Sequence, residues 1–215
     1  MSAWSRWLRN AAGCTAWAVM AWAQPAASAP QDFMATRPSA DATYLVDWVL
    51  QSGDARGRPF AVVDKRAARL YVFRADGHLA GHTPAILGST IGDQIVPGVG
   101  ARAQIGAVRP DERTTPAGRF DAEPGRNDKG EHVVWVDYDS AFAIHRLRPG
   151  FAYQARAAQL ANWGAHGKRM SWGCVVVPVA FYQQVVERVL GAGRSVVYVM
   201  PERASLPAVF GAPQL

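Results

Sequence analysis

Residues 168–178 read KRMSWGCVVVP, and they contain Cys174, the only cysteine after residue 14. A glycine precedes this thiol and three valines follow it. A structural disulfide needs a second cysteine, and a residue that only fills space needs no sulfur, since alanine or serine would serve. The role of Cys174 therefore depends on the fate of the other cysteine, Cys14, near the N-terminus.

The N-terminal segment has the pattern of a secretory signal peptide. Two arginines form a short basic region, residues 11–23 form an uncharged apolar stretch, and small residues follow, which is typical of exported proteins. The stretch falls short of the roughly 20 apolar residues that span a bilayer; the alternatives are an uncleaved anchor and a buried helix. We assign residues 1–23 to the signal, with cleavage as late as residue 29 as the alternative. We expect export to the periplasm or cell envelope of a bacterium.

Removal of the signal removes Cys14 and leaves Cys174 without an intramolecular partner. An unpaired thiol in an exported protein indicates a reactive group or intermolecular pairing; the alternative is an inert, buried cysteine that packs as a small hydrophobe. The net charge says less about function. The 23 basic and 17 acidic residues give +6, or +4 without the two arginines of the signal. The basic residues are scattered with no dense run, so we expect no nucleic-acid partner.

The apolar pattern predicts a single α+β domain dominated by β-strands. Residues 24–42 are rich in Ala, Pro and Ser and read as a linker, residues 43–203 form the domain, and residues 204–215 form a C-terminal tail. Short β-branched and aromatic runs between turns predict mostly antiparallel strands. They lie within residues 60–64, 69–77, 78–88, 114–125, 132–139, 140–147 and 194–200. Helical spacing predicts two or three helices, over 43–51, 151–163 and 178–190, and the Gly- and Pro-rich segment 89–108 reads as a loop.

A catalytic cysteine needs a group that accepts its proton or lowers its pKa. His78, His82 and His132 lie beside turns and are expected to be solvated surface residues. His145 follows the apolar run FAI at a strand end, where the backbone is rigid, and a helix separates it from Cys174. His166 lies only eight residues before Cys174, in a glycine-flanked loop that positions a side chain poorly. We therefore predict His145 as the base.

The neighbours of Cys174 fit a nucleophile. Gly173 allows the backbone to approach a substrate closely, and the N–H groups of Gly173 and Cys174 are candidate donors to an oxyanion. Ser171 adds a hydroxyl donor. Arg169 and Lys168 are expected to place positive charge near the thiol, which favours the thiolate and attracts a carboxylate.

At this point the sequence resembles the L,D-transpeptidase (YkuD-type) catalytic domain. S-x-G-C followed by β-branched residues, with an Ile-His pair upstream, carries the resemblance. Further stretches resemble an exported branch of the family, from about residue 60 to 200: VDKRAARLYVFRADG, TPAILGSTIGD, VPGVG, RPDERTTPAGRF, VWVDYDSAFAIHR, KRMSWGCVVVP and FYQQVV. S-x-G-C alone is unspecific, but its order with TTPAGRF and AIHR is quite specific.

The resemblance implies a β-sandwich-type fold with the cysteine in a cleft, and acyl transfer on peptidoglycan stem peptides. Cys174 would attack the stem peptide and expel its terminal D-amino acid. An amine from a second stem, or from an envelope lipoprotein, would then resolve the thioester. His145 would match the catalytic histidine, and Ser171 and Gly173 the motif residues; Arg169 and Trp172 are further candidates for substrate binding. No cofactor and no metal are implied, and we expect a monomer.

The chain departs from the family pattern at three positions. Arg146 stands where the family has glycine, Trp172 where it commonly has histidine, and Val176 where it often has arginine or asparagine. Val176 bears most on substrate choice, because valine cannot hold a polar group. Three alternatives stay open: an L,D-carboxypeptidase or hydrolase on the same stems, a catalytically weak wall-binding protein, and a metal site formed by Cys174, His145 and His166.

Overall fold

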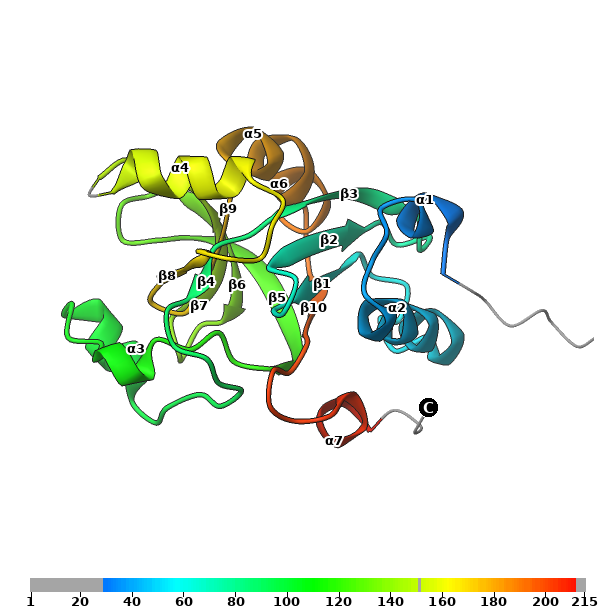
Figure 1. Ribbon diagram of the computed structural model, residues 1–215, viewed down its shortest axis with the longest axis horizontal. Helices are drawn as coiled ribbons and strands as arrows, with labels where there is room; N and C mark the ends of the chain where they lie inside the picture. The colour runs from blue at the N-terminus through cyan, green and yellow to red at the C-terminus, as the bar shows by residue number, and fades with distance from the viewer. Residues whose placement is uncertain (1–28, 151, 212–215) are drawn as a thin grey trace, which may run out of the picture.

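One mixed sheet organises the chain, in the order β3-β2-β1-β10-β5-β6-β7-β9 (Figure 1). The computed structural model describes residues 29–150 and 152–211, so the predicted signal peptide lies outside the described residues. The strands are β1 (Phe60–Asp64), β2 (Arg69–Phe73), β3 (Leu79–Pro84), β4 (Leu87–Gly88), β5 (Gly118–Arg126), β6 (His132–Asp137), β7 (Phe142–Arg146), β8 (Arg169–Ser171), β9 (Val175–Val177) and β10 (Ser195–Val199). Strands β4 and β8 form a separate two-stranded sheet.

The helices lie around the sheet. They are α1 (Gln31–Met34), α2 (Ala40–Ser52), α3 (Val99–Gln104), the 3-10 turn η1 (Pro110–Glu112), α4 (Tyr153–Ala161), α5 (Val179–Phe181), the π-helical η2 (Tyr182–Val186), α6 (Glu187–Val189) and α7 (Leu206–Phe210). Elements α5, η2 and α6 follow one another without a break. Among the described residues, no helix is long and apolar enough to cross a membrane.

The long strand β5 joins the two halves of the large sheet. Its first five residues, 118–122, pair with β10, and residues 123–126 pair with β6. Both halves contribute to one apolar core, with Val63 and Val72 from one half and Val134 and Ile144 from the other. Side chains alternate between the two faces along a strand. In the first half of the sheet, the side chains on the opposite face are apolar as well, so that face also has to be covered.

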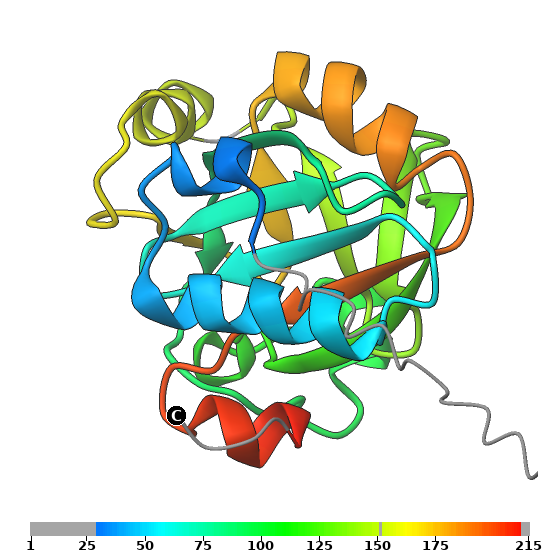
Figure 2. The same cartoon turned by 90° about the vertical axis from the view of Figure 1, so that its right-hand side faces the viewer.

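Helices α1, α2 and α7 cover that opposite face, as Figure 2 shows for α1 and α2 in blue and α7 in red. Phe33 of α1 is fully buried there, with its ring centroid 5.1 Å from that of Tyr71. Leu206 of α7 is buried in the same cluster. The segment predicted as a linker is therefore helical and packed from Gln31 onward, and the segment predicted as a tail contains α7. Both helices are too short, at 4 and 5 residues, to show helical spacing in the sequence.

The structure is an α+β fold dominated by β-strands, as predicted, and it differs from the prediction in two respects. The prediction of two or three helices was too low, because α1 and α7 are short and α3 lies in the segment predicted as a loop. Antiparallel pairs predominate in the large sheet, but β1 pairs with β10 and β7 pairs with β9 in parallel. The second parallel pair positions the candidate active site.

Candidate active site

His145 of β7 and Cys174, which immediately precedes the adjacent parallel strand β9, reach one face of the sheet. In the pairing of β7 with β9, Ile144 is opposite Val175 and His145 is opposite Val176. Ile144 and Val175 belong to the apolar core. Because side chains alternate, His145, Val176 and Cys174 leave the other face of the sheet.

Both side chains line one open cavity of about 680 Å³. The lining also includes small apolar, polar, charged and aromatic residues from four segments: Ala103, Gln104, Arg126, Asn127, Asp128, Val133, Trp135, Tyr138, Ala141, Ala143 and Arg148. His166 is exposed and is not part of this lining. The structure therefore brings His145, and not His166, to the cavity of Cys174.

A backbone hydrogen bond fixes the imidazole of His145. Its Nδ1 lies 2.8 Å from the carbonyl oxygen of Arg146. A carbonyl can only accept, so Nδ1 carries the proton and Nε2 has a free lone pair. Burial, and then the positive charge of Arg148, lower the pKa of His145 to about 4. The imidazole is consequently neutral at physiological pH and available as a base.

The thiol of Cys174 is protonated in the resting site. Burial raises its pKa, and a hydrogen bond with the backbone of Ala143 and the charge of Arg148 act in the opposite direction without reversing the shift. The Sγ atom donates a long hydrogen bond of 3.5 Å to the carbonyl of Ala141, and no hydrogen bond joins Cys174 to His145. The resting pair is a neutral thiol beside a neutral imidazole.

Ser171 and Gly173 build the turn that presents Cys174. The hydroxyl of Ser171 donates to the carbonyl of Cys174 at 2.6 Å and accepts the N–H of Gly173 at 3.1 Å. Gly173 has φ +131°, and a Cβ there would lie 2.8 Å from the carbonyl oxygen of Thr114, so this position requires glycine. The Ser171 hydroxyl and the Gly173 N–H, predicted as donors to an oxyanion, both make hydrogen bonds within the turn in this structure.

Arg169 and Lys168, predicted to place positive charge near the thiol, have other partners in the structure. Arg169 forms an ion pair with Glu202 and donates to the carbonyl of Lys65 at 3.2 Å. Lys168 is buried and donates to the carbonyls of Gln159 and, at 2.6 Å, Asn162 near the end of α4. Neither side chain lines the cavity of Cys174. Both belong to the segment before the turn, and Arg169 lies on β8, which pairs with β4 instead of β7.

Arg148 is the cavity arginine whose charge acts on both His145 and Cys174. Its Nε lies 2.8 Å from Oε2 of Glu131, but the N–H does not point at that oxygen and makes no hydrogen bond. Glu131 also pairs with Arg146 at 2.7 Å, so one carboxylate faces two guanidinium groups. Positive charge therefore remains beside the thiol. In the sequence, the only indication of this role is that Arg148 lies three residues after His145.

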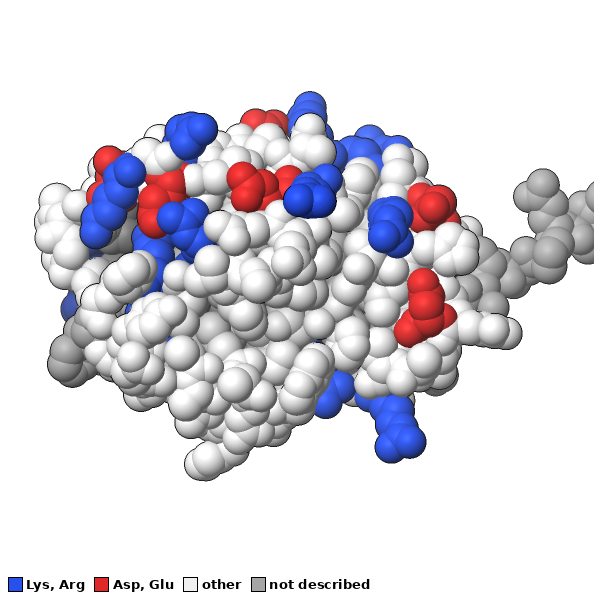
Figure 3. Space-filling model, turned by 90° about the horizontal axis from the view of Figure 1, so that it is seen from above, with Lys and Arg blue, Asp and Glu red and all other residues white. Residues whose placement is uncertain are grey.

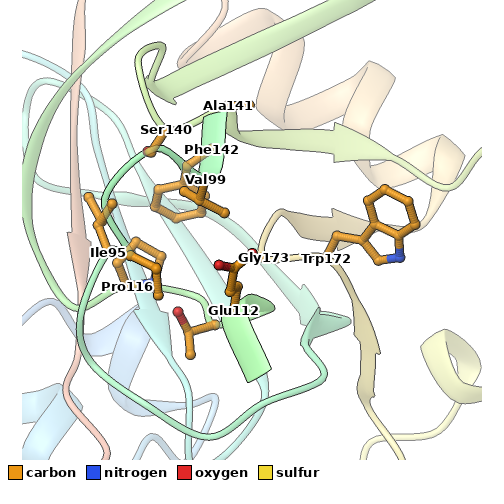
Figure 4. Close-up of a pocket in the computed structure, with 11 residues that line it drawn as sticks. Ile95, Val99, Glu112, Pro116, Ser140, Ala141, Phe142, Trp172 and Gly173 are labelled. Atoms are coloured by element: carbon orange, nitrogen blue, oxygen red, sulfur yellow. The ribbon is translucent and has the colours of Figure 1, made fainter. Parts of the chain in front are cut away.

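Trp172 is half exposed and does not line the cavity of Cys174. The guanidinium of Arg113 lies 4.7 Å from the centroid of its ring. Together with Gly173 it lines a small hollow of about 20 Å³, whose other walls are largely apolar. Figure 4 shows Phe142, Val99, Ile95 and Pro116 gathered on one side of this hollow, with the indole apart from them. Ala141 lines both this hollow and the larger cavity.

Val176 is a packing residue. It is fully buried in a cluster with Ile86, Leu147 and Leu160, against which residues of α4 pack. A charged side chain at this position would lose its hydration in an apolar cluster. The surroundings of this position beside His145 therefore favour an apolar side chain.

Two histidines differ from their predicted surface role. His132 Nδ1 lies 2.9 Å from the hydroxyl of Tyr182, which is buried in η2. His82 stacks on Tyr71, with ring centroids 5.9 Å apart. His78 is exposed, with Nδ1 3.7 Å from a carboxylate oxygen of Asp32. Sequence spacing does not show these packing partners, because they come from distant segments.

Charged side chains of both signs are interspersed on the face that carries α4 to α6. Figure 3 shows them along the upper edge and the right-hand side of that face, around a broad area without charged groups at the lower left. Among residues 29–150 and 152–211, no group of three His, Cys, Asp or Glu side chains is placed to hold a metal ion. The described residues therefore give no support to the alternative of a zinc site at Cys174, His145 and His166.

No protein-family model and no curated protein matches this chain. Among solved structures, the chain is similar to one titled "Structure of LD transpeptidase LdtMt1 in complex with imipenem", with 16% sequence identity and a TM-score of 0.37. The match covers 66% of this chain and 58% of that one. The chain thus spans less than two thirds of the length of the protein it is compared with.

Proposed function

We propose that this protein is a cysteine-dependent acyltransferase that acts on peptidoglycan stem peptides, as an L,D-transpeptidase. The observation that carries the proposal is the pairing of Cys174 with a neutral, backbone-anchored His145 in one open cavity. A thiol nucleophile with a positioned base is the minimal apparatus for acyl transfer.

The reaction begins with proton transfer from Sγ of Cys174 to Nε2 of His145 as the sulfur attacks the peptide carbonyl. Because no hydrogen bond joins the two groups at rest, the thiol first rotates toward the ring or uses one water, and catalytic hydrogen bonds often tighten only when substrate binds. The C–N bond then breaks, the imidazolium returns the proton to the leaving amine, and a thioester remains on Cys174. A second amine attacks the thioester, loses a proton to His145 and releases the thiolate, which is reprotonated.

The cavity lining supports a peptide substrate with carboxylates. Arg148 and Arg126 offer positive charge, and the rings of Trp135 and Tyr138, 5.1 Å apart in an edge-to-face arrangement, offer an apolar wall. The order of the motifs TTPAGRF, AIHR and SWGC in the sequence supports peptidoglycan stems as that peptide. The predicted signal segment supports action outside the cytoplasm, where such stems and an envelope lipoprotein acceptor are found.

The test is incubation with a tetrapeptide stem, followed by mass spectrometry of the intact protein and of the muropeptides. We expect a covalent adduct on Cys174 that Cys174→Ser abolishes. His145→Ala should abolish the adduct, while the matched His166→Ala should retain it. Absence of an adduct in the wild-type protein, or its loss only in His166→Ala, contradicts the proposal.

The products separate the related activities. Cross-linked dimers indicate transpeptidation, whereas trimmed monomers alone indicate an L,D-carboxypeptidase or hydrolase, in which water takes the acyl group. A weakly catalytic wall-binding protein is a second candidate, favoured by the protonated state of Cys174 in the resting site. Stem binding without an adduct would favour that candidate.

A further inference from the structure

A buried threonine outside the cavity connects two segments of the site. The Oγ1 of Thr115 donates to the carbonyl of Gly173 at 2.8 Å and accepts the N–H of Gly88 at 2.8 Å. Thr115 is completely buried. A hydroxyl has one hydrogen, and the N–H of Gly88 can only donate, so the direction of both bonds is fixed.

Thr115 is itself held by a buried cation. The Nζ of Lys65 donates to the carbonyl of Thr115 at 2.8 Å, to Oδ1 of Asp93 at 2.8 Å and to the carbonyl of Gly92 at 2.7 Å. The side chain of Lys65 is fully buried. All three ammonium hydrogens are thereby used, and Thr115 cannot shift without breaking a charge-assisted hydrogen bond.

The bond from Thr115 sets the direction of one N–H group at the nucleophile. The carbonyl of Gly173 and the N–H of Cys174 belong to the same peptide group, and no cis peptide bond occurs among the described residues. In a trans peptide these two groups point in opposite directions. Holding the Gly173 carbonyl toward Thr115 therefore turns the Cys174 N–H away from it.

The Cys174 N–H is the backbone donor that the turn leaves open. The Gly173 N–H is bonded to Ser171, and within the described part of the chain no acceptor is found for the N–H of Cys174. Without Thr115 the peptide could rotate, because Gly173 has the φ of +131° that only glycine adopts readily.

We propose that Thr115 is a positioning residue that aims the Cys174 N–H at the oxyanion formed when Cys174 attacks a carbonyl. The inference rests on the proposed acyl-transfer function and deepens it. Preorganised donors act on the charge that develops in the transition state. Loss of the Thr115 hydroxyl should therefore slow acylation and spare reactions of the thiol that form no oxyanion.

The test compares two reagents on Thr115→Val. Acylation by p-nitrophenyl acetate passes through an oxyanion, whereas alkylation by iodoacetamide does not, and both are measured as the fraction that depends on Cys174. We expect acylation to fall about 10- to 100-fold, at or below the usual effect of deleting one oxyanion donor, with alkylation and its pH profile unchanged. Thr115→Ser, which keeps the hydroxyl, should restore acylation.

Thr83→Val is the matched control. Thr83 is also buried and donates to a carbonyl, that of Pro84 at 3.2 Å, but this hydrogen bond stays within β3 and does not reach the turn at Cys174. Both rates should stay at wild-type values. If Thr115→Val does not fold, Thr115→Ala gives the same comparison without the added methyl group.

Two results would overturn the inference: wild-type acylation in Thr115→Val and Thr115→Ala, or an equal fall of acylation and alkylation. Failure of the proposed function is distinguishable. If the wild-type thiol accepts an acyl group from the ester but not from a stem peptide, the substrate assignment fails and the role of Thr115 stands. If neither the ester nor the stem peptide acylates wild-type Cys174, the results contradict both the proposed function and the role of Thr115.

Discussion

His145 is opposite Val176 in the parallel pairing of β7 with β9, so the imidazole is offset by two residues from Cys174 on the neighbouring strand. Two residues along a strand correspond to about 7 Å, and side chains must close that gap. The offset explains why the thiol bonds to the carbonyl of Ala141, at 3.5 Å, and not to the imidazole. For the proposed reaction, we therefore expect proton transfer to accompany attack by the sulfur and not to precede it.

A neutral resting pair predicts the pH dependence of thiol alkylation. The pKa of Cys174 is raised by burial, and His145, with a pKa of about 4, is uncharged above pH 5 and cannot stabilise a thiolate. Alkylation of Cys174 by iodoacetamide should rise about tenfold per pH unit through the neutral range, because only the thiolate reacts. A plateau in rate between pH 5 and 7 would show a thiolate–imidazolium pair instead.

Arg148 should control the pKa of both groups. Its charge lowers the pKa of His145 and of Cys174, so Arg148→Gln should raise both. The measurements are the NMR titration of the His145 ring and the pH profile of alkylation. The titration midpoint should move up from about 4, and the alkylation profile should move to higher pH.

Arg126→Gln is the matched control, because Arg126 lines the same cavity and donates to the carbonyl of Gly130 at 2.6 Å. It is not among the groups that shift either pKa. Equal shifts in the two variants would mean that the effect is general to the positive charge around the cavity and not specific to Arg148.

The strand positions of the site were predictable because they depend on local alternation. In FAIHR, an apolar run leads to a histidine at a strand end, and His145 lies at that place in β7. The roles of Arg169 and Thr115 were not predictable. The partner of Arg169 is Glu202, and Thr115 bonds to Gly173, 58 residues away, so both depend on loops that come together only in the fold.

The same limit applies to the ends of the domain. Residues 31–34 read as part of a linker because the segment is rich in Ala and Pro, yet Phe33 is buried against Tyr71. A single aromatic residue has no periodicity, so its partner, 38 residues later, gives the sequence pattern no signal. Helical spacing identified α2 and α4, where several apolar residues share a face.

Trp172 should contribute to binding of a stem peptide and not to the reactivity of the thiol. It is 48% exposed beside Gly173, with Arg113 over its ring. Trp172→Ala should raise the KM for a stem peptide about tenfold, since a stacking aromatic side chain contributes about 1 kcal/mol or more to binding, and should leave alkylation of Cys174 unchanged.

Trp163→Ala is its control. Trp163 is 47% exposed and has Arg69 5.4 Å from its ring centroid, but it packs at a tilted angle against His82 and lines neither the cavity of Cys174 nor the small hollow beside Gly173. The Trp163→Ala variant should leave the KM for the stem peptide unchanged. A similar rise in KM in both variants would indicate a general loss of aromatic surface.

Asp93 should give the protein an acid-sensitive component of stability. Burial acts to raise its pKa, but hydrogen bonds from Lys65 and from the backbone N–H groups of Ala204 and Arg203 outweigh burial and lower it. A carboxyl whose pKa is lower in the folded state stabilises above its unfolded pKa, about 3.9, and loses that stabilisation as the pH falls through the folded value. Asp93→Asn should cost about 3 kcal/mol at pH 7, as for a broken buried ion pair.

The decisive measurement is urea unfolding of both proteins between pH 7 and pH 2.5, in which the difference in free energy of unfolding should shrink below about pH 4. Asp121→Asn is the control: its carboxylate pairs with Arg58 at 2.8 Å, the same distance as Asp93 to Lys65, but it is 49% exposed where Asp93 is 7% exposed. An exposed pair contributes about 1 kcal/mol or less. An equal cost of the two substitutions, or a cost of Asp93→Asn that does not change with pH, would show that the carboxylate of Asp93 is not held as an ion in the folded protein.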